Sequence, residues 1–190
     1  MKQESRKQSL EIEFRETKNS AEENSWLKTV LTEAFPKDER PPFSFLRERM
    51  IEHVEWLIII AEGEKAGFVY LMSDDEQVYL FYLAMDRKMR GKYIGTQALL
   101  KLIERYPDKN FFLAIEPVDE SLPDYQQRLK RKNFYLNCGL RETGQRVREG
   151  KVIFDILSTR GRVNPQKYEK MMADWLGNAF PAPARARMFE

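Results

Sequence analysis

VYLFYLAMDRKMRGKYIGTQALL, residues 78–100, predicts a buried strand, a basic turn and the first turns of an amphipathic helix. Residues 78–85 are all aromatic or aliphatic, which is typical of a strand that is largely buried. Asp86 and the cations after it end this run. Beyond the turn, apolar residues recur at the 3.6-residue spacing of a helix that packs on a core. They are Ile94, Ala98, Leu99, Leu102, Ile103 and Tyr106.

The turn between this strand and this helix favours an anion. The start of a helix leaves backbone N–H groups unpaired and carries a partial positive charge, so a pyrophosphate can lie on it. Gly91 and Gly95 have no Cβ and let a ligand approach the backbone. Arg90 and Lys92 add positive charge and hydrogen-bond donors. We therefore expect a phosphate-containing ligand at this turn.

The same turn resembles the signature of a known family. Arg90-Gly91-Lys92-Tyr93-Ile94-Gly95 is similar to the pattern of the acetyl-CoA-dependent N-acetyltransferase (GNAT) superfamily: Gln or Arg, two residues, Gly, one residue, then Gly or Ala. Arg90 and Gly95 match the first and last positions, whereas Tyr93 replaces the middle glycine. The resemblance implies acetyl-CoA as cosubstrate, with its pyrophosphate on a run of consecutive residues. These are Arg90, Gly91, Lys92, Tyr93, Ile94, Gly95 and Thr96.

A second motif lies at the end of a helix expected over residues 123–138. Phe134-Tyr135, three residues, then Gly139 and Leu140 resemble the family's second hallmark, although phenylalanine is commoner where Leu140 stands. Gly139 also suits the residue just past a helix end. The resemblance implies that Tyr135 protonates the departing CoA sulfur, because a phenol with a pKa near 10 keeps its proton at pH 7. The resemblance covers residues 10–160.

The remaining patterns predict an α+β fold. Three antiparallel strands precede a strand–helix–strand unit, which favours a mixed sheet over a doubly wound one. Strands are expected at residues 11–17, 56–62, 67–72, 78–85, 110–116, 140–148 and 151–158, and helices at 19–35, 43–53, 94–106, 123–138 and from 164. The resemblance implies a GNAT-like, mostly antiparallel central sheet of six to seven strands with helices on both faces. It also implies a parallel pair that splays apart at the cofactor site.

The chain divides into an expected N-acetyltransferase domain, residues 1–160, and a C-terminal extension, residues 161–190. Asn164 can cap a helix whose first residue is Pro165. Its apolar stripe consists of Tyr168, Met171, Met172, Trp175, Leu176 and Phe180. We expect this helix to dock on the chain's own domain rather than on a second copy, and residues 181–190 to be a mobile tail.

Composition narrows the function classes. The 190 residues are 42% hydrophobic and 33% charged, within the range of soluble globular proteins. The single cysteine suits the cytoplasm, and with one histidine it leaves no Cys/His metal site to expect. No apolar run has the length of a membrane span. A net charge of +2 gives no general reason to expect nucleic acid, although the run RLKRK, residues 128–132, keeps a nucleic-acid-binding module open as a rival.

Acetyl transfer to an amine requires a site for the thioester carbonyl, a proton donor for the sulfur and an acceptor for the amine proton. The resemblance places the carbonyl at the backbone N–H groups of Leu83, Ala84 and Met85, with Met85 the best candidate. The base is not identified, because Tyr79 stands where relatives sometimes have a glutamate. Glu116, at the end of a neighbouring strand, is the nearest carboxylate by topology. A water relay is the alternative, and His53, at a helix–strand junction, is expected to be structural.

The sequence therefore predicts an enzyme that transfers an acetyl group directly from acetyl-CoA to a primary amine. The acceptor is left open among small amines, amino acids, aminoglycosides, polyamines and protein N-termini, and the protein is expected to be a monomer or homodimer. A rival keeps the fold without the chemistry, as an acyl-CoA-binding sensor or interaction protein. Tyr93 in the signature and the missing carboxylate at Tyr79 favour that rival.

Overall fold

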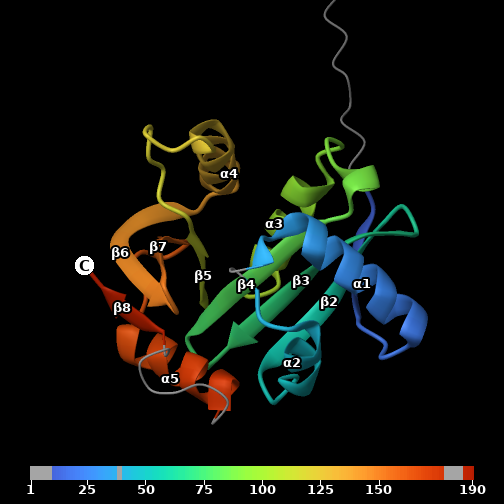
Figure 1. Ribbon diagram of the computed structural model, residues 1–190, viewed down its shortest axis with the longest axis horizontal. Coiled ribbons are helices and arrows are strands. Elements are labelled where there is room, and N and C mark those ends of the chain that lie inside the picture. Colours follow the sequence, from blue (N-terminus) through green and yellow to red (C-terminus); the bar gives the residue numbers. More distant parts are fainter. Residues whose placement is uncertain (1–9, 38–39, 178–185) are drawn as a thin grey trace, which may run out of the picture.

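The computed structural model describes residues 10–37, 40–177 and 186–190 (Figure 1). The strands are β1 Ile12–Glu16, β2 Val54–Ala61, β3 Glu64–Ser73, β4 Gln77–Met85, β5 Asn110–Ile115, β6 Arg141–Glu149, β7 Val152–Ser158 and β8 Arg187–Phe189. The helices are α1 Ala21–Ala34, α2 Phe43–Glu48, α3 Ile94–Glu104, α4 Tyr125–Asn137 and α5 Pro165–Leu176, with a 3₁₀ turn, η2, at Arg87–Met89. The eight strands form one sheet in the order β1-β2-β3-β4-β5-β7-β6-β8.

The sheet is mostly antiparallel, and β4 with β5 is its parallel pair. Helices cover both faces, as Figure 1 shows for α1 and α2 in front of the sheet and α3 behind it. One core cluster joins α1, α2 and α5 to the first face and includes Trp56, Tyr70 and Tyr79. The other joins α3 and the end of α4 to the second face and includes Leu80 and Leu99. The predicted α+β architecture is confirmed.

The parallel pair opens part of the way along. β4 and β5 are paired from Gln77 opposite Asn110 as far as Leu80 opposite Leu113, whereas β4 continues to Met85. The splay implied by the family resemblance is therefore present in this chain. It separates the two strands at the end of the sheet from which α3 starts.

A β-bulge in β4 lies where the opening begins. Against β3, Leu80 is opposite Leu71 and Tyr82 is opposite Tyr70, so that Phe81 is the additional residue. A bulge bends its strand and increases the local twist. It also places two successive side chains on one face, since both Phe81 and Tyr82 pack against the core cluster of α1, α2 and α5. The bulge therefore accounts for the divergence of β4 from β5.

Helix α1 begins where the sequence predicts, because the Ser20 hydroxyl accepts a hydrogen bond from the Glu23 N–H (3.2 Å). The expected extent of the second helix, to His53, is wrong, since α2 ends at Glu48. The chain turns there instead: His53 has a φ of 67°, and Val54 N–H donates to the Ile51 carbonyl (3.1 Å). The fourth helix begins at Tyr125 rather than at residue 123.

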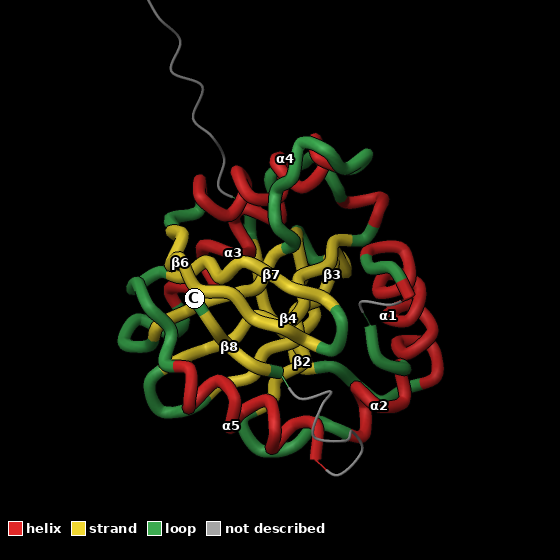
Figure 2. The backbone as a smooth tube through the Cα atoms, turned by 60° about the vertical axis from the view of Figure 1, so that its left-hand side comes forward, coloured by secondary structure: helices red, strands yellow, loops and turns green. Residues whose placement is uncertain are grey.

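The C-terminal segment joins the same fold. Asn164 caps α5 with its side-chain oxygen, and Tyr168, Met172 and Trp175 are buried in the core cluster of the first face. The expectation of a mobile tail over residues 181–190 is wrong for the part that is described, because β8 pairs with β6 (Figure 2). β6 has β7 on its other side, so β8 covers an edge that would otherwise be open. Phe180 and residues 181–185 lie outside the described part of the chain.

Within the described ranges, none of the helices combines the length and apolar character needed to cross a membrane.

Candidate active site

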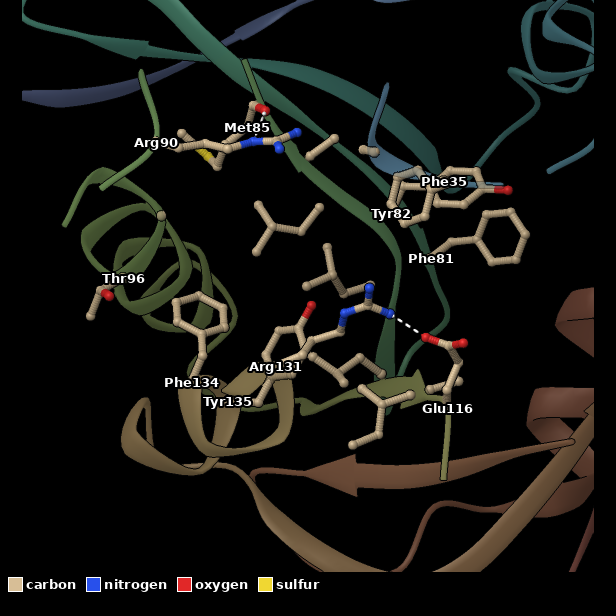
Figure 3. Close-up of a pocket in the computed structure, with 18 of the residues that line it drawn as sticks. Phe35, Phe81, Tyr82, Met85, Arg90, Thr96, Glu116, Arg131, Phe134 and Tyr135 are labelled. Carbon is tan, nitrogen blue, oxygen red and sulfur yellow. Dashed lines mark hydrogen bonds and ion pairs between the residues drawn. The ribbon is translucent and has the colours of Figure 1, made fainter. Parts of the chain in front are cut away.

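A pocket of about 550 Å³ lies where β4 and β5 part (Figure 3). Its walls are residues 79–85 of β4, residues 113–116 at the end of β5, the turn before α3, and parts of α1, α4 and the β6–β7 hairpin. Both core clusters contribute to this lining, for example Tyr82 from the first face and Leu83 from the second. The pocket therefore passes through the sheet, and two molecules can meet in it from opposite faces.

One end of the pocket lies at the start of α3. The first intrahelical hydrogen bond runs from Gln97 N–H to the Tyr93 carbonyl (3.1 Å), so the N–H groups of residues 94–96 come before the helical ladder. Arg90 Nε donates to the Met85 carbonyl (3.2 Å), which holds the guanidinium across the opening between β4 and α3. This end offers a positive charge and free donor positions to an anion.

Tyr93, which replaces the middle glycine of the pattern, adopts a backbone conformation that is typical of glycine. Its backbone is left-handed, with a φ of 58° and a ψ of 5°, a conformation that glycine adopts without cost and other residues adopt rarely. Its side chain is turned to solvent, with 73% of the residue exposed. The replacement thus strains the backbone and leaves the surface of the turn open to a ligand.

The edge of β4 that faces the opening presents backbone donors. Asp86 N–H donates to the Ala66 carbonyl of the neighbouring chain segment (2.9 Å), and successive N–H groups of a strand point to opposite sides. Ala84 N–H therefore points to β3, while those of Leu83 and Met85 point into the opening. Leu83, Ala84 and Met85 all line the pocket, but only Leu83 and Met85 direct a backbone N–H into it.

Tyr135 reaches the pocket from α4. Figure 3 shows its hydroxyl directed into the cavity, beside Phe134, whose ring centroid lies 4.9 Å from that of Tyr135. Burial raises the pKa of Tyr135 to about 12, more than the positive charge of Arg131 lowers it. The phenol therefore stays protonated over the neutral range and can donate a hydrogen bond or a proton.

Glu116 also lines the pocket, but both of its carboxylate oxygens are engaged. Oε1 contacts an Arg128 nitrogen at 3.0 Å and Oε2 contacts an Arg131 nitrogen at 2.6 Å. Only 12% of the Glu116 side chain is exposed. A substrate proton would have to displace one of these ion pairs, and the assignment of Glu116 as base stays a prediction.

The other proposed cofactor contacts are placed unevenly. Gly91, Tyr93, Ile94, Gly95 and Thr96 line the pocket together with Arg90. Lys92 is exposed and is not part of the lining. Gly95 has a negative φ, and a Cβ added to it would lie in ordinary contact with Met85 (3.6 Å) and Phe134 (3.9 Å).

A carboxylate that sequence reasoning missed lies at the other end of the pocket. Glu149, the last residue of β6, accepts hydrogen bonds from the hydroxyl groups of Tyr79 (2.7 Å) and Tyr168 (2.6 Å). Burial raises the pKa of Glu149, and the two hydroxyl donors oppose that rise. In the sequence it stands beside Gly150 as an ordinary turn residue, and its partners are far away in the chain. No local signal could have found it.

Aromatic rings surround this second end. Phe35, Phe81, Tyr82 and Phe154 line it, and Figure 3 shows the first three grouped on the side of the pocket away from α3. The Phe35 and Phe81 ring centroids each lie 4.5 Å from that of Tyr82. Across the part of the chain that is described, no group of three or more His, Cys, Asp and Glu side chains is placed to hold a metal ion.

Solved structures share this fold. A GNAT-family protein from Bacteroides thetaiotaomicron superposes with a TM-score of 0.65 at 22% identity, over 86% of this chain and 95% of that one. An acetyltransferase from Bacillus subtilis, in complex with CoA, gives a TM-score of 0.55 at 18% identity, over 79% of this chain and 97% of that one. A GNAT-family acetyltransferase from Elizabethkingia anophelis with acetyl-CoA bound gives a TM-score of 0.55 at 16% identity, over 80% of this chain and 98% of that one. These likenesses are evidence of the fold alone.

The sequence itself carries the assignment to a family. No curated protein sequence matches the chain. Residues 21–129, more than half of the chain's 190 residues, match the Acetyltransferase (GNAT) family. This range contains β4, the turn at Arg90 and the start of α3, which together build one end of the pocket. The protein belongs to the GNAT acetyltransferase family.

Proposed function

We propose that the protein transfers an acetyl group from acetyl-CoA directly to a primary amine. The observation that carries this proposal is the pocket that crosses the sheet between β4 and β5. It has anion-binding groups at one end and a carboxylate at the other, so a thioester and an amine can approach each other within it. Family membership supports acetyl transfer as the chemistry.

At the first end, the pyrophosphate of acetyl-CoA is expected to bind the N–H groups at the start of α3, with Arg90 as a cation in the same lining. Met85 N–H, and Leu83 N–H next to it on the same edge, are the donors for the thioester carbonyl oxygen. They would stabilise the negative charge that develops on this oxygen when the amine attacks.

Tyr135 is expected to donate its proton to the CoA sulfur as the carbon–sulfur bond breaks. Its place inside the pocket and its protonated state at neutral pH support this role. The amine must lose a proton on its way to the amide. Of the carboxylates that line the pocket, Glu116 and Glu149 are the candidates to accept it.

The direct test is an assay of CoA release from acetyl-CoA, with and without a panel of primary amines, coupled to detection of the acetylated amine by mass spectrometry. Amine-dependent CoA release with a matching N-acetyl product is the expected result. An acyl-CoA-binding sensor would bind acetyl-CoA without releasing CoA in the presence of any amine. Binding measured by calorimetry alongside turnover separates these two functions.

A further inference from the structure

Glu149 is held by two hydroxyl groups that bind the same oxygen. Tyr79 from β4 and Tyr168 from α5 both donate to Oε1, at 2.7 and 2.6 Å. No group in the described residues makes a hydrogen bond or ion pair with Oε2, although Glu149 lines the pocket. One oxygen thus anchors the carboxylate, and the other is available to a ligand.

The two tyrosines are themselves immobilised. Tyr79 is 2% exposed and Tyr168 is 0% exposed. The Tyr79 ring stacks on Phe112 with a centroid distance of 4.8 Å and an angle of 6° between the planes. Both tyrosines belong to the same core cluster. Glu149 is therefore oriented by rigid groups on two different elements, as a functional carboxylate requires.

The surroundings leave Glu149 without a compensating cation. Of the titratable groups on the elements packed against it, Tyr79 and Tyr168 bind it directly, whereas Glu169 of α5 accepts from Met188 N–H and Tyr82 is a further phenol on β4. The charged residues on α5 and β7 have other partners: Lys167 pairs with Asp75 and Glu76, Lys170 with Asp174, and Asp155 with Arg146. No lysine or arginine of the described chain is paired with it. Desolvation consequently favours the protonated carboxyl, and a raised pKa brings a glutamate closer to the range in which a general base works at neutral pH.

The lining at this end selects an acceptor by charge and shape. Of the carboxylates that line the pocket, Glu116 is paired with Arg128 and Arg131, whereas Glu149 and the exposed Glu33 pair with no cation of the described residues. Of the lining arginines, Arg131 is tied to Glu116 and Arg90 donates to the Met85 carbonyl. The walls are aromatic, from Phe35, Phe81, Tyr82 and Phe154. A positive charge is attracted by both carboxylates and by ring faces, and an apolar arm is desolvated by the rings. A carboxylate on the acceptor would be repelled.

We propose that Glu149 is the catalytic base of this enzyme, and that it receives the ammonium group of a primary amine whose remaining part is apolar and flat and carries no acid. This inference rests on the proposed acetyl transfer. Glu116 then acts through Arg131, which it fixes across the pocket with an ion pair of 2.6 Å.

The proton balance of this step is complete. Oε2 of Glu149 takes one proton from the ammonium, and the neutral amine forms a carbon–nitrogen bond to the thioester carbon. The carbon–sulfur bond then breaks, and Tyr135 gives its proton to the thiolate. The second proton on nitrogen, released as the amide forms, restores Tyr135 through solvent. Glu149 loses its proton to water, so the products are the N-acetyl amine, CoA and one proton.

The test uses 2-phenylethylamine as the acceptor and phenylalanine as its acid-bearing counterpart. With acetyl-CoA, the wild-type protein should acetylate the amine and reject the amino acid. In Glu149→Gln, kcat/KM for the amine should fall by about 100-fold or more, the scale of general-base catalysis, and the acid limb of the pH–rate profile should disappear. Glu142→Gln, on the same strand and 57% exposed, is the matched control and should behave as wild type.

Two further measurements separate catalysis from folding. Tyr79→Phe removes one donor to the charged carboxylate, which raises the pKa of Glu149 and should move the acid limb to higher pH. Glu149→Gln should melt no lower than wild type at pH 7. The pKa of Glu149 is higher in the folded chain than in the unfolded chain, so the protonated carboxyl stabilises the fold and this stabilisation is lost as the pH rises through the folded-state pKa. Glutamine does not ionise, so the variant does not lose stability in this way.

Calorimetry of 2-phenylethylamine binding to the CoA complex distinguishes the possible failures. If the wild type binds the amine but does not acetylate it, and Glu149→Gln does not bind it, the ammonium site is supported and the proposed function is overturned. Normal transfer with an unchanged acid limb in Glu149→Gln would overturn the role of Glu149 and keep the proposed function. Equal rates with 2-phenylethylamine and phenylalanine would overturn the acceptor class.

Discussion

At the scale of single residues, the site combines groups whose roles follow from local position with one whose role does not. Tyr93 and Tyr135 stand inside motifs, and the backbone angle of the first and the burial of the second give each a physical meaning. Glu149 becomes notable only through the two hydroxyl groups that bind it. Contacts between residues this far apart in a chain come from the tertiary fold, which local patterns do not contain.

Removing the hydroxyl of Tyr135 tests its role as proton donor. Tyr135→Phe keeps the ring next to Phe134, so affinity for CoA should change little. If the phenol protonates the leaving sulfur, kcat should fall by roughly 100-fold, the low end for general-acid catalysis. Single-turnover rates and CoA binding by calorimetry provide the measurement. Wild-type turnover in the variant would show that the ring only packs.

Tyr93→Gly tests the strained turn. Glycine relieves a left-handed backbone that costs other residues about 1–2 kcal/mol, while its greater freedom in the unfolded chain returns part of that gain. The unfolding free energy should therefore rise slightly or stay level, and CoA affinity should not fall. Urea denaturation measures the first and calorimetry the second. Tyr93→Ala, which keeps the left-handed backbone strain, is the control. If Tyr93→Gly were less stable than Tyr93→Ala, the backbone at residue 93 would not be strained.

At the scale of elements, the unit of β4, turn and α3 is the part that the sequence predicts best. Its apolar run, its charged turn and its helical stripe are continuous in the chain, and β4 and α3 appear within a residue or two of the expected bounds. Elements whose ends depend on distant partners were predicted less well. Helix α2 stops early where Arg49 turns to the carbonyl groups of Asp174 and Trp175, and β8 forms because β6 offers an open edge.

Gly95→Asp tests whether the start of α3 binds the pyrophosphate. An acidic residue in the first turn is favourable for a helix, and there is room for a Cβ, so the fold should be retained. The added negative charge should weaken CoA binding by at least about 1–3 kcal/mol, the scale of one or two charge-assisted hydrogen bonds. Gly95→Ala, which adds the Cβ alone, should bind nearly as wild type. Equal CoA affinity in both variants would place the pyrophosphate elsewhere.

At the scale of the whole molecule, the C-terminal extension takes part in the core. Trp175 is 3% exposed and donates from Nε1 to the Tyr70 hydroxyl (2.9 Å), which in turn lies 3.2 Å from the Leu46 carbonyl. Tyr168 of the same helix holds Glu149. Residues beyond 160 thus stabilise the sheet and hold a carboxylate that lines the pocket. The amphipathic stripe predicted that this helix packs, whereas its contact with the site was not foreseeable.

Trp175→Ala measures that contribution. Truncating a buried tryptophan costs about 3–5 kcal/mol of unfolding free energy, and the Tyr70 hydroxyl would also lose a donor. The melting transition should shift strongly downward as one cooperative step. Lys170→Ala on the exposed side of α5 should leave it nearly unchanged, since that side chain is 76% exposed. A separate early transition in Trp175→Ala, with the rest melting as wild type, would show that α5 is an independent unit.

The bulge at Phe81 makes the opening between β4 and β5 depend on the number of residues in β4. Loss of this one residue, an in-frame deletion of a single codon, would restore a regular ladder between Leu80 opposite Leu71 and Tyr82 opposite Tyr70. The N–H groups of β4 that face β5 would regain the spacing of a regular parallel ladder, and the pairing of the two strands could extend beyond Leu113. No substitution achieves the same change. In this chain, a change of length at residue 81 is therefore the change expected to close the opening between β4 and β5.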